Sequence, residues 1–525
     1  MPFLSFAFVG FMILLLFIYF IIPKKYQWCL LLVGSYIFYA YATPYFLVFL
    51  VISTVITYFC GVKLGQCTDA LKNALNHEDQ PLSKEERKAL KHQTEHKKKL
   101  ILAGCLFLNI LILAVLKYFN FCSDNMTALI QLFGGYYEFP KVNWLLPLGI
   151  SFYTFITVGY CIDVYRELCE PQKNIFKYAL FVSYFPQISQ GPINRYHELS
   201  TQLYEEHAFE ISRFKSGGYR IVIGLFKKVV VADRLAVYVD RVYGLPQTYS
   251  ALTLLAATVF YAIQIYCDFS GYMDISIGIS DMLGIKMSEN FDKPYFSRSI
   301  PEYWRRWHIT LGAWFRDYLY YPVIRSKWCK NLSKKIEQHC SKKAGRAIGT
   351  VSGLLIVWFT TGLWHGASWH YVMHGLYHGT LIILSFLLAG TFQSIREKLH
   401  IKNESKVFHV FQMIRTFILV DISYILFRSG SMKDAWYIMK TIVGSMRISV
   451  EEIKQSLLPF TEDNTAVAFS LVVVAAILGV FICELADYNQ KDLFRKHKYV
   501  NAVLMLVIIL LFGMFGQSSF IYMQY

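Results

Sequence analysis

The stretch "FLSFAFVGFMILLLFIYFII", residues 3–22, contains no charged side chain and decides the class of fold. A helix of about 20 apolar residues is long enough to cross the hydrocarbon core of a bilayer. Similar runs recur along the chain: "LILAGCLFLNILILAVL" (100–116), "LLIVWFTTGLW" (354–364), "LIILSFLLAG" (381–390), "LVVVAAILGVFI" (471–482) and "VLMLVIILLFGMF" (503–515). We therefore expect an all-α polytopic membrane protein with roughly ten to twelve transmembrane helices, some of them short or re-entrant.

The composition agrees with a membrane-embedded chain. Of 525 residues, 55% are hydrophobic and only 17% are charged, and the mean hydropathy is +0.37. These values are too apolar for an ordinary soluble enzyme of this size. The first run lacks the basic start and the small-residue cleavage site of a signal peptide, which predicts a retained helix. With no internal repeat or low-complexity linker in the sequence, we expect a single membrane-embedded domain over residues 1–525.

The positive charge of the chain is concentrated in two segments. The net charge is +16, and the basic residues cluster between residues 84 and 99 and between residues 325 and 346, which we interpret as inter-helix loops. The positive-inside rule predicts that both face the cytoplasm. Lys24 and Lys25 after the first helix, and the basic run 491–498 before the last one, then place both termini outside the cytoplasm. This distribution favours a membrane lipid environment and argues against a nucleic-acid partner.

The cysteines show no metal-binding pattern. Most of the eleven lie in apolar runs and no pair has CxxC spacing, which predicts that they act as small hydrophobic residues. Cys329, His339 and Cys340 share a basic segment but lack the paired spacing of a zinc site. We expect no bound metal, and the absence of a Walker loop or a GxGxxG after a strand pattern argues against nucleotide chemistry.

A second stretch, "YWRRWHITLGAWFRDYLYYP" (303–322), combines charged and aromatic residues in an unusual way. Pro294 and Pro301 upstream are expected to interrupt any helix. From Trp304 onward, aromatic and apolar residues recur every three or four positions, which predicts one amphipathic helix that is interfacial or re-entrant. Two interpretations remain open. His308 is either functional or a satisfied structural histidine beside arginines that reach the headgroups.

A third stretch, "TTGLWHGASWHYVMHGLYHG" (360–379), contains four histidines at or between two apolar runs. Ionisable groups at membrane depth are costly and are functional candidates. Histidine suits general-base chemistry near neutral pH. The spacing of His370, His374 and His378 also fits a metal stripe, but the surrounding glycines and aromatics favour tight helix packing. His365 differs because Gly366 after it permits close approach of a backbone or a substrate.

The second and third stretches resemble the two histidine-bearing signatures of the membrane-bound O-acyltransferase (MBOAT) superfamily. Four further segments resemble its bacterial polysaccharide-modifying branch: "PLGISFYTFITVGYCIDVYR" (147–166), "FPQISQGPINRY" (185–196), "GLFKKVVVADRLA" (224–236) and "YCDFSGYMDISIGISDMLGI" (266–285). The resemblance covers residues 144–379 and is specific. Within this branch the chain is similar to subunits that O-acetylate alginate or peptidoglycan. One departure is "YPVIRSKWCKN" (321–331), where many relatives have a glycine-rich turn.

The resemblance implies a ring of helices around a central tunnel in the bacterial cytoplasmic membrane. A thioester donor, acetyl-CoA or an acyl carrier, would enter from the cytoplasm, with no bound cofactor, and the acceptor would be served from outside. The family's two histidines match His365, our candidate base, and His308. Acyl transfer requires a base for the hydroxyl and a group that stabilises the oxyanion. The residues expected to position the donor or orient its partners are Trp304, Arg305, Arg306, Asp317 and Trp364.

The chain ends in the aromatic tail "GQSSFIYMQY" (516–525). Composition alone favours an interfacial aromatic belt. The resemblance implies instead that Phe520, Tyr522 and Tyr525 match a terminal F-x-Y-x-x-F pattern whose tyrosine relays the acyl group. The receiver would be an extracytoplasmic transferase of the SGNH, esterase-like type, with peptidoglycan as the favoured polymer.

Two other functions stay open at this point. A D-alanyltransferase of teichoic acids shares both histidine signatures, although its tyrosine motif usually lies on a separate small subunit. A transporter or flippase would show pseudo-symmetric halves with interrupted helices at matching positions. No such halves are visible in the sequence.

Overall fold

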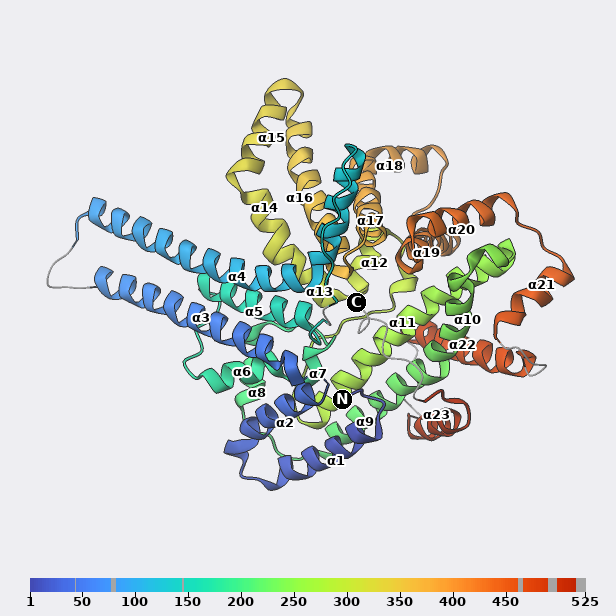
Figure 1. Cartoon of the computed structure of the whole chain (residues 1–525), viewed down its shortest axis with the longest axis horizontal. Helices are drawn as coiled ribbons and strands as arrows, with labels where there is room; N and C mark the ends of the chain where they lie inside the picture. Colours follow the sequence, from blue (N-terminus) through green and yellow to red (C-terminus); the bar gives the residue numbers. More distant parts are fainter. Residues whose placement is uncertain (43, 77–81, 144–145, 461–465, 490–497, 516–525) are drawn as a thin grey trace. The chain divides into compact units, whose positions relative to one another are not determined.

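The computed structural model describes residues 1–42, 44–76, 82–143, 146–460, 466–489 and 498–515 (Figure 1). Within these residues the ordered backbone is helical, and the only strand-like pairing is an isolated antiparallel bridge between Phe291 and Trp307. The chain forms two compact units. Unit 1 comprises residues 1–215 and 279–288, and unit 2 comprises residues 216–278 and 289–525.

Long apolar helices confirm the expected all-α polytopic membrane fold. In the part of the chain that the structure describes, six helical segments are long and apolar enough to cross a membrane, or seven if a pair bent by 61° is one span. They are Pro44–Leu75, Lys84–Leu132, Ala251–Met282, Lys342–His365, Lys406–Arg428, Leu471–Tyr488 and the bent pair Trp369–Leu387 with Ala389–Lys398. Three shorter apolar helices are Phe6–Ile21, Ile150–Tyr165 and Lys498–Phe512. The first of them shows that the apolar run 3–22 forms a helix of 16 residues, shorter than expected.

Unit 1 is built around the long pair α3 and α4. Its main helices are α1 (Phe6–Ile21), α2 (Gln27–Ala42), α3 (Leu47–Leu75), α4 (Lys84–Leu132), α5 (Ile150–Tyr165), α6 (Ile175–Ser183), α7 (Phe185–Ile188) and α8 (Tyr196–Tyr204). α3 and α4 lie side by side (Figure 1) and both pack against α5. α5 is buried on almost every side, which explains why its sequence is apolar without a polar stripe.

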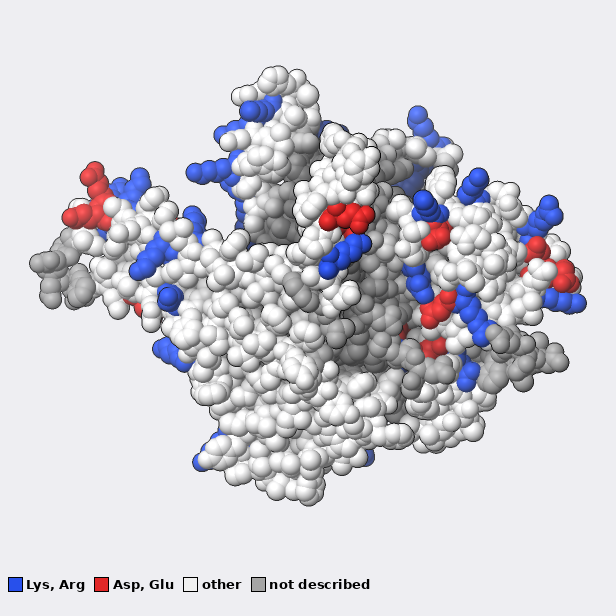
Figure 2. All heavy atoms as spheres, in the orientation of Figure 1, with Lys and Arg blue, Asp and Glu red and all other residues white. Residues whose placement is uncertain are grey.

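The first basic segment is not a loop, contrary to our expectation. Residues 84–99 form the first turns of α4, which begins with a capping box between Ser83 and Glu86. Lysine, glutamate and arginine are good helix formers, so a charged sequence extends the apolar helix beyond the hydrophobic run. Figure 2 shows charged side chains of both signs gathered toward the free end of the α3–α4 pair.

Unit 2 contains the two histidine-bearing stretches. Its main helices are most of α9 (Ile211–Leu225), α10 (Asp233–Gly244), α11 (Ala251–Met282), α12 (Ile300–Arg306), α13 (Ile309–Phe315), α14 (Tyr321–Arg325), α15 (Lys327–His339), α16 (Lys342–His365), α17 (Trp369–Leu387), α18 (Ala389–Lys398), α19 (Lys406–Arg428), α20 (Met432–Gly444), α21 (Val450–Leu457), α22 (Ala466–Tyr488) and α23 (Lys498–Phe512). Two π-helical turns, Phe226–Ala232 and Arg316–Tyr320, connect neighbouring helices.

The second basic segment is also helical rather than a loop. It forms α15 and the first turn of α16, two helices that pack side by side (Figure 1). Ser326 and Ser341 cap the two helices with side-chain hydrogen bonds. Cys329 is buried against α16, whereas His339 and Cys340 are exposed near the helix end. The helix therefore separates the three residues that the sequence placed together.

Helices α16 and α17 form a tight hairpin through glycines. A methyl group on Gly375 would lie 2.3 Å from the carbonyl oxygen of Trp358, and one on Gly362 would lie 2.6 Å from that of Tyr371. Only glycine permits this close backbone approach. The hairpin therefore holds His365, at the end of α16, and the histidines of α17 in a fixed relation, as the packing interpretation predicted.

Candidate functional site

The helix expected over the second stretch is broken at His308. α12 ends at Arg306, α13 begins at Ile309, and His308 between them adopts left-handed backbone angles, φ 47° and ψ 53°. The prediction of one continuous amphipathic helix is therefore wrong. Pro301 also does not interrupt a helix, because it lies in the first turn of α12, where a proline is tolerated.

A short extended segment stabilises this break. The peptide N–H of Asp292 donates to the carbonyl of Arg306 at 2.9 Å, and that of Ile309 donates to the carbonyl of Asn290 at 3.0 Å. The helix break leaves backbone N–H and C=O groups without partners inside the helices. These bonds, together with the bridge between Phe291 and Trp307, satisfy some of those groups. A non-glycine residue adopts a positive φ at an energetic cost, so the surrounding structure must stabilise that conformation. We therefore regard the backbone conformation of His308 as a constraint imposed by the hydrogen bonds around it.

Asn290 sets the tautomer of His308. Its Oδ1 accepts from the peptide N–H of Thr310 at 3.1 Å and from the Thr310 hydroxyl at 3.0 Å, which identifies it as the amide oxygen. His308 Nδ1 lies 3.2 Å from the same oxygen and must therefore carry the proton that it donates. The ring is 1% exposed, and burial lowers its pKa to about 3. His308 is thus a neutral imidazole whose Nε2 is an acceptor.

Acid is expected to destabilise unit 2 through His308. The folded pKa is lowered from 6.5 to about 3, so the unfolded chain takes up a proton first as the pH falls. The stability conferred by the neutral ring is complete above pH 6.5 and is lost progressively toward pH 3, with a loss of about 2 kcal/mol at pH 5. The Tm measured between pH 7.5 and 5 should fall more steeply in the wild type than in His308→Gln. Parallel curves would contradict this assignment.

The ring of Trp364 lies between His308 and the histidines of the third stretch. The Trp364 ring centroid lies 5.9 Å from that of His308 and 4.9 Å from that of His365. The His365 ring lies 5.9 Å from that of His374, which is 4.9 Å from that of His378. We call these five residues the imidazole cluster. The sequence predicted His308, Trp364 and His365 as site residues, and the fold brings them together within unit 2.

Ser423 of α19 orients the two deeper histidines. His374 Nδ1 lies 3.0 Å from the Ser423 carbonyl oxygen, which only accepts, so this nitrogen carries the proton. The Ser423 hydroxyl donates to the carbonyl of Val420 at 2.6 Å and therefore accepts from His378 Nε2 at 2.8 Å. Each of these two histidines is thus hydrogen-bonded through one ring nitrogen to Ser423, which fixes the orientation of both rings.

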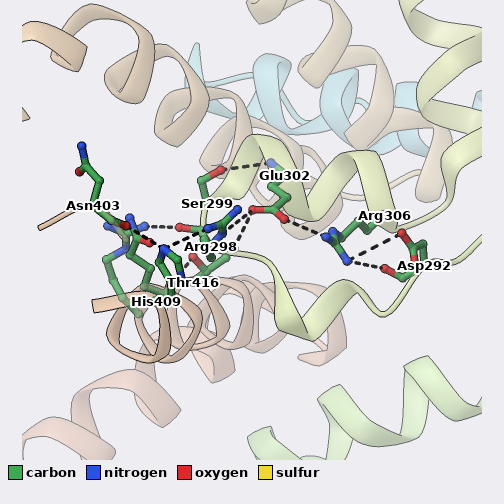
Figure 3. Close-up of polar contacts among 10 residues, drawn as sticks. Asp292, Arg298, Ser299, Glu302, Arg306, Asn403, His409 and Thr416 are labelled. Carbon is green, nitrogen blue, oxygen red and sulfur yellow. Dashed lines mark hydrogen bonds and ion pairs between the residues drawn. The ribbon is translucent and has the colours of Figure 1, made fainter. Parts of the chain in front are cut away.

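Arg306 forms ion pairs with two carboxylates near the helix break. Its guanidinium lies 3.1 Å from Glu302 and 3.7 Å from Asp292 (Figure 3). Arg305 is exposed, and Trp304 packs its ring 4.9 Å from that of His378. Asp317, predicted to orient an arginine, pairs with its neighbour Arg316 at 2.9 Å.

A cavity of about 500 Å³ adjoins this break inside unit 2. Asn290 lines it, so the residue that holds His308 also forms part of the cavity wall. Arg220 lies 2.5 Å from Glu289 and 3.1 Å from Asp274 on another wall, and Lys227 lies 2.9 Å from Asp274. Burial lowers the pKa of Lys227, but Asp274 and Glu484 outweigh it and raise the pKa above its ordinary value, so the cavity keeps charged groups.

Sequence reasoning missed Asn290 and Ser423. Each lies on an element that carries no histidine signature, and no local pattern marks either residue as a partner of an imidazole. Tyr522, the predicted relay, lies outside the described residues.

Comparison with known proteins decides the family. Residues 171–336 match the family model described as MBOAT, membrane-bound O-acyltransferase family. The chain is 30% identical to a probable alginate O-acetylase of Azotobacter vinelandii over 470 residues, which cover 90% of this chain and 83% of the relative. The chain belongs to the membrane-bound O-acyltransferase family.

Other relatives of this MBOAT protein differ in the polymer that their names indicate. A peptidoglycan O-acetyltransferase of Helicobacter pylori is 27% identical, with 94% of this chain and 91% of the relative covered. A teichoic acid D-alanyltransferase of Bacillus subtilis is 31% identical, but only 46% of this chain and 60% of the relative are covered. The chain is thus a multi-pass membrane enzyme and an O-acyltransferase, as the sequence predicted.

Proposed function

We propose that the whole chain, residues 1–525, is one acyltransferase that moves an acetyl group from a cytoplasmic thioester to an exported polysaccharide, with peptidoglycan as the favoured acceptor. The donor is acetyl-CoA or a carrier-bound thioester. The names of the relatives that cover most of the chain support acetyl transfer to a polysaccharide. The observation that carries the proposal is the imidazole cluster, because it places buried proton acceptors side by side within a membrane-embedded unit.

His365 is the general base of the proposed reaction. It takes the proton of the attacking hydroxyl while the hydroxyl oxygen forms a bond to the thioester carbonyl carbon. The tetrahedral intermediate then expels the thiolate, which takes up that proton. His308 is a poor base, since a pKa of about 3 lies far below the working pH. Its role is to position the reacting groups as a neutral acceptor beside Trp364.

The cavity beside Asn290 supports the donor side of this reaction. Its volume of about 500 Å³ falls in the range of small-molecule sites. Asn290 connects its wall to His308 by the 3.2 Å hydrogen bond. A thioester arm in this cavity would approach the imidazole cluster from the side of the helix break. Arg306, held between Glu302 and Asp292, stiffens that break (Figure 3).

Tyr522 completes the proposed reaction as a relay. Its phenol, activated by His365, accepts the acetyl group as an ester and passes it to an extracytoplasmic, esterase-like transferase. We propose that the protein lies in the bacterial cytoplasmic membrane with both termini outside. The basic ends of α4 and α15 then face the cytoplasm, as the positive-inside rule requires.

The donor decides between acetyl transfer and the D-alanyl transfer named in the Bacillus subtilis relative. Purified protein in lipid vesicles is incubated with radiolabelled acetyl-CoA, with an acetylated carrier protein, or with a D-alanylated one. We expect consumption of an acetyl thioester and none of the D-alanyl thioester. D-alanyl consumption alone would assign the alternative, and consumption of no thioester would favour a transporter.

A further inference from the structure

Three buried cysteines of unit 1 meet at one point, far from one another in sequence. Cys60 belongs to α3, Cys105 to α4 and Cys161 to α5, and each is 5% exposed or less. Their sulfur atoms all lie within 4.8 Å of one another, and those of Cys105 and Cys161 are 3.7 Å apart. We call them the sulfur triad.

The geometry points to a metal site. Three sulfurs bound to one cation at about 2.3 Å, the usual metal–thiolate length, would lie about 4 Å apart in a plane. The sulfur separations, 3.7 Å for one pair and no more than 4.8 Å for the others, approach this arrangement. We propose that the sulfur triad binds one monovalent copper ion, Cu(I), in three-coordinate geometry. This site belongs to unit 1 and does not depend on the proposed acyl transfer.

Cu(I) fits the triad better than other common cations. Thiolates are soft ligands that select Cu(I), zinc or iron–sulfur clusters. Structural zinc takes four ligands, whereas no fourth His, Cys, Asp or Glu joins the group in the described part of the chain. Oxygen-seeking cations such as Mg²⁺ or Ca²⁺ find no carboxylate there. A cation that accepts three sulfur ligands therefore matches the donor set.

Polar groups around the sulfurs are arranged to support a bound cation. Asn109 Nδ2 lies 3.8 Å from Cys105 Sγ, within the longer limit of sulfur hydrogen bonds, and its Oδ1 accepts from Ser53 at 2.6 Å. Cys161 Sγ donates to the carbonyl of Thr57 at 3.6 Å. The Tyr178 hydroxyl in turn donates to the Thr57 side chain at 2.9 Å. These contacts orient the residues that surround the sulfurs.

The charges balance with two thiolates. On binding Cu(I), Cys60 and Cys105 each release one proton to solvent, whereas Cys161 keeps the proton that it donates to Thr57 and binds as a thiol. The site then carries one net negative charge. The amide of Asn109, which donates to the Cys105 carbonyl at 3.0 Å, also lies 3.8 Å from the Cys105 sulfur, where its second N–H stabilises that charge. No oxidant or reductant takes part in this step.

Anaerobic titration of the full-length protein tests the proposal. Cu(I) is added with ascorbate in the presence of a coloured Cu(I) chelator, and retained copper is measured. We expect one tightly held ion per chain, a Tm that rises on loading, and X-ray absorption showing three sulfurs at about 2.3 Å. Cys60→Ser, Cys105→Ser and Cys161→Ser should each weaken retention by at least tenfold, by analogy with the loss of a ligand.

Matched cysteines on the same helices serve as controls. Cys67→Ser changes another buried thiol of α3, and Cys122→Ser an exposed thiol of α4, and both should retain copper like the wild type. Size-exclusion profiles and the Tm of copper-free protein establish that the triad variants are folded. Retention unchanged by all three triad substitutions, or no retention by the wild type, would overturn the proposal. A Cys105–Cys161 disulfide in protein purified with reductant would overturn it as well and identify a redox pair.

Discussion

His365→Ala is expected to reduce acyl transfer by a factor of 10²–10⁴, the usual contribution of a positioned general base. The substitution removes the proposed acceptor of the hydroxyl proton and leaves the helix intact, since alanine favours the last turn of α16. The measurement is the rate of acetyl-thioester consumption at saturating donor. Because the effect arises in the chemical step, kcat should fall while KM for the donor stays within a few-fold.

His370→Ala is the matched control for this variant. His370 lies in the same hairpin, but its Nδ1 contacts Ser368 at 2.9 Å and its ring packs on Tyr371 instead of His365. It should keep most of its activity. If His365→Ala retained at least half of the wild-type rate, another residue would have to be the base. His308→Gln then becomes informative, because glutamine keeps an amide donor toward Asn290 but has no imidazole.

The sequence predicted the helical membrane class because that class depends on local properties. Twenty apolar residues identify a span by length alone, and histidines in an apolar run are visible without knowledge of the fold. The fold places the rings of His308, Trp364 and His365 side by side, whereas their catalytic roles stay predictions. Helix continuity was harder to predict. The spacing from Trp304 onward is helical, yet tertiary hydrogen bonds to Asn290 and Asp292 override it at His308.

Features that depend on distant residues were not predictable. The residues Cys60, Cys105 and Cys161 lack any metal-site spacing, and each fits an apolar helix as a small hydrophobic residue. They meet only because α3, α4 and α5 pack together. The basic segments were misread as loops for a different reason. The charge of a segment predicts on which side of the membrane it lies. Helix propensity and a cap such as Ser83 decide whether its backbone is helical, and these two properties are independent.

Tyr522→Phe is expected to abolish acetylation of the C-terminal peptide while leaving the protein folded. Phenylalanine keeps the aromatic ring but removes the phenolic oxygen that we propose forms the ester, so an obligatory relay at this residue would lose all transfer to the acceptor. The measurement is radiolabel on the C-terminal peptide after incubation with the acetyl thioester, together with transfer to polysaccharide when the extracytoplasmic transferase is present.

Tyr525→Phe is the matched control, because it makes the same change three residues further along the tail. It should retain the label. The two variants also separate the relay from the base: His365→Ala should lose both label and thioester consumption. Tyr522→Phe should lose the label but continue slow hydrolysis, in which water replaces the phenol as the nucleophile activated by His365. A labelled C-terminal peptide in Tyr522→Phe would exclude Tyr522 as the relay and would mean that another hydroxyl of the tail carries the acetyl group.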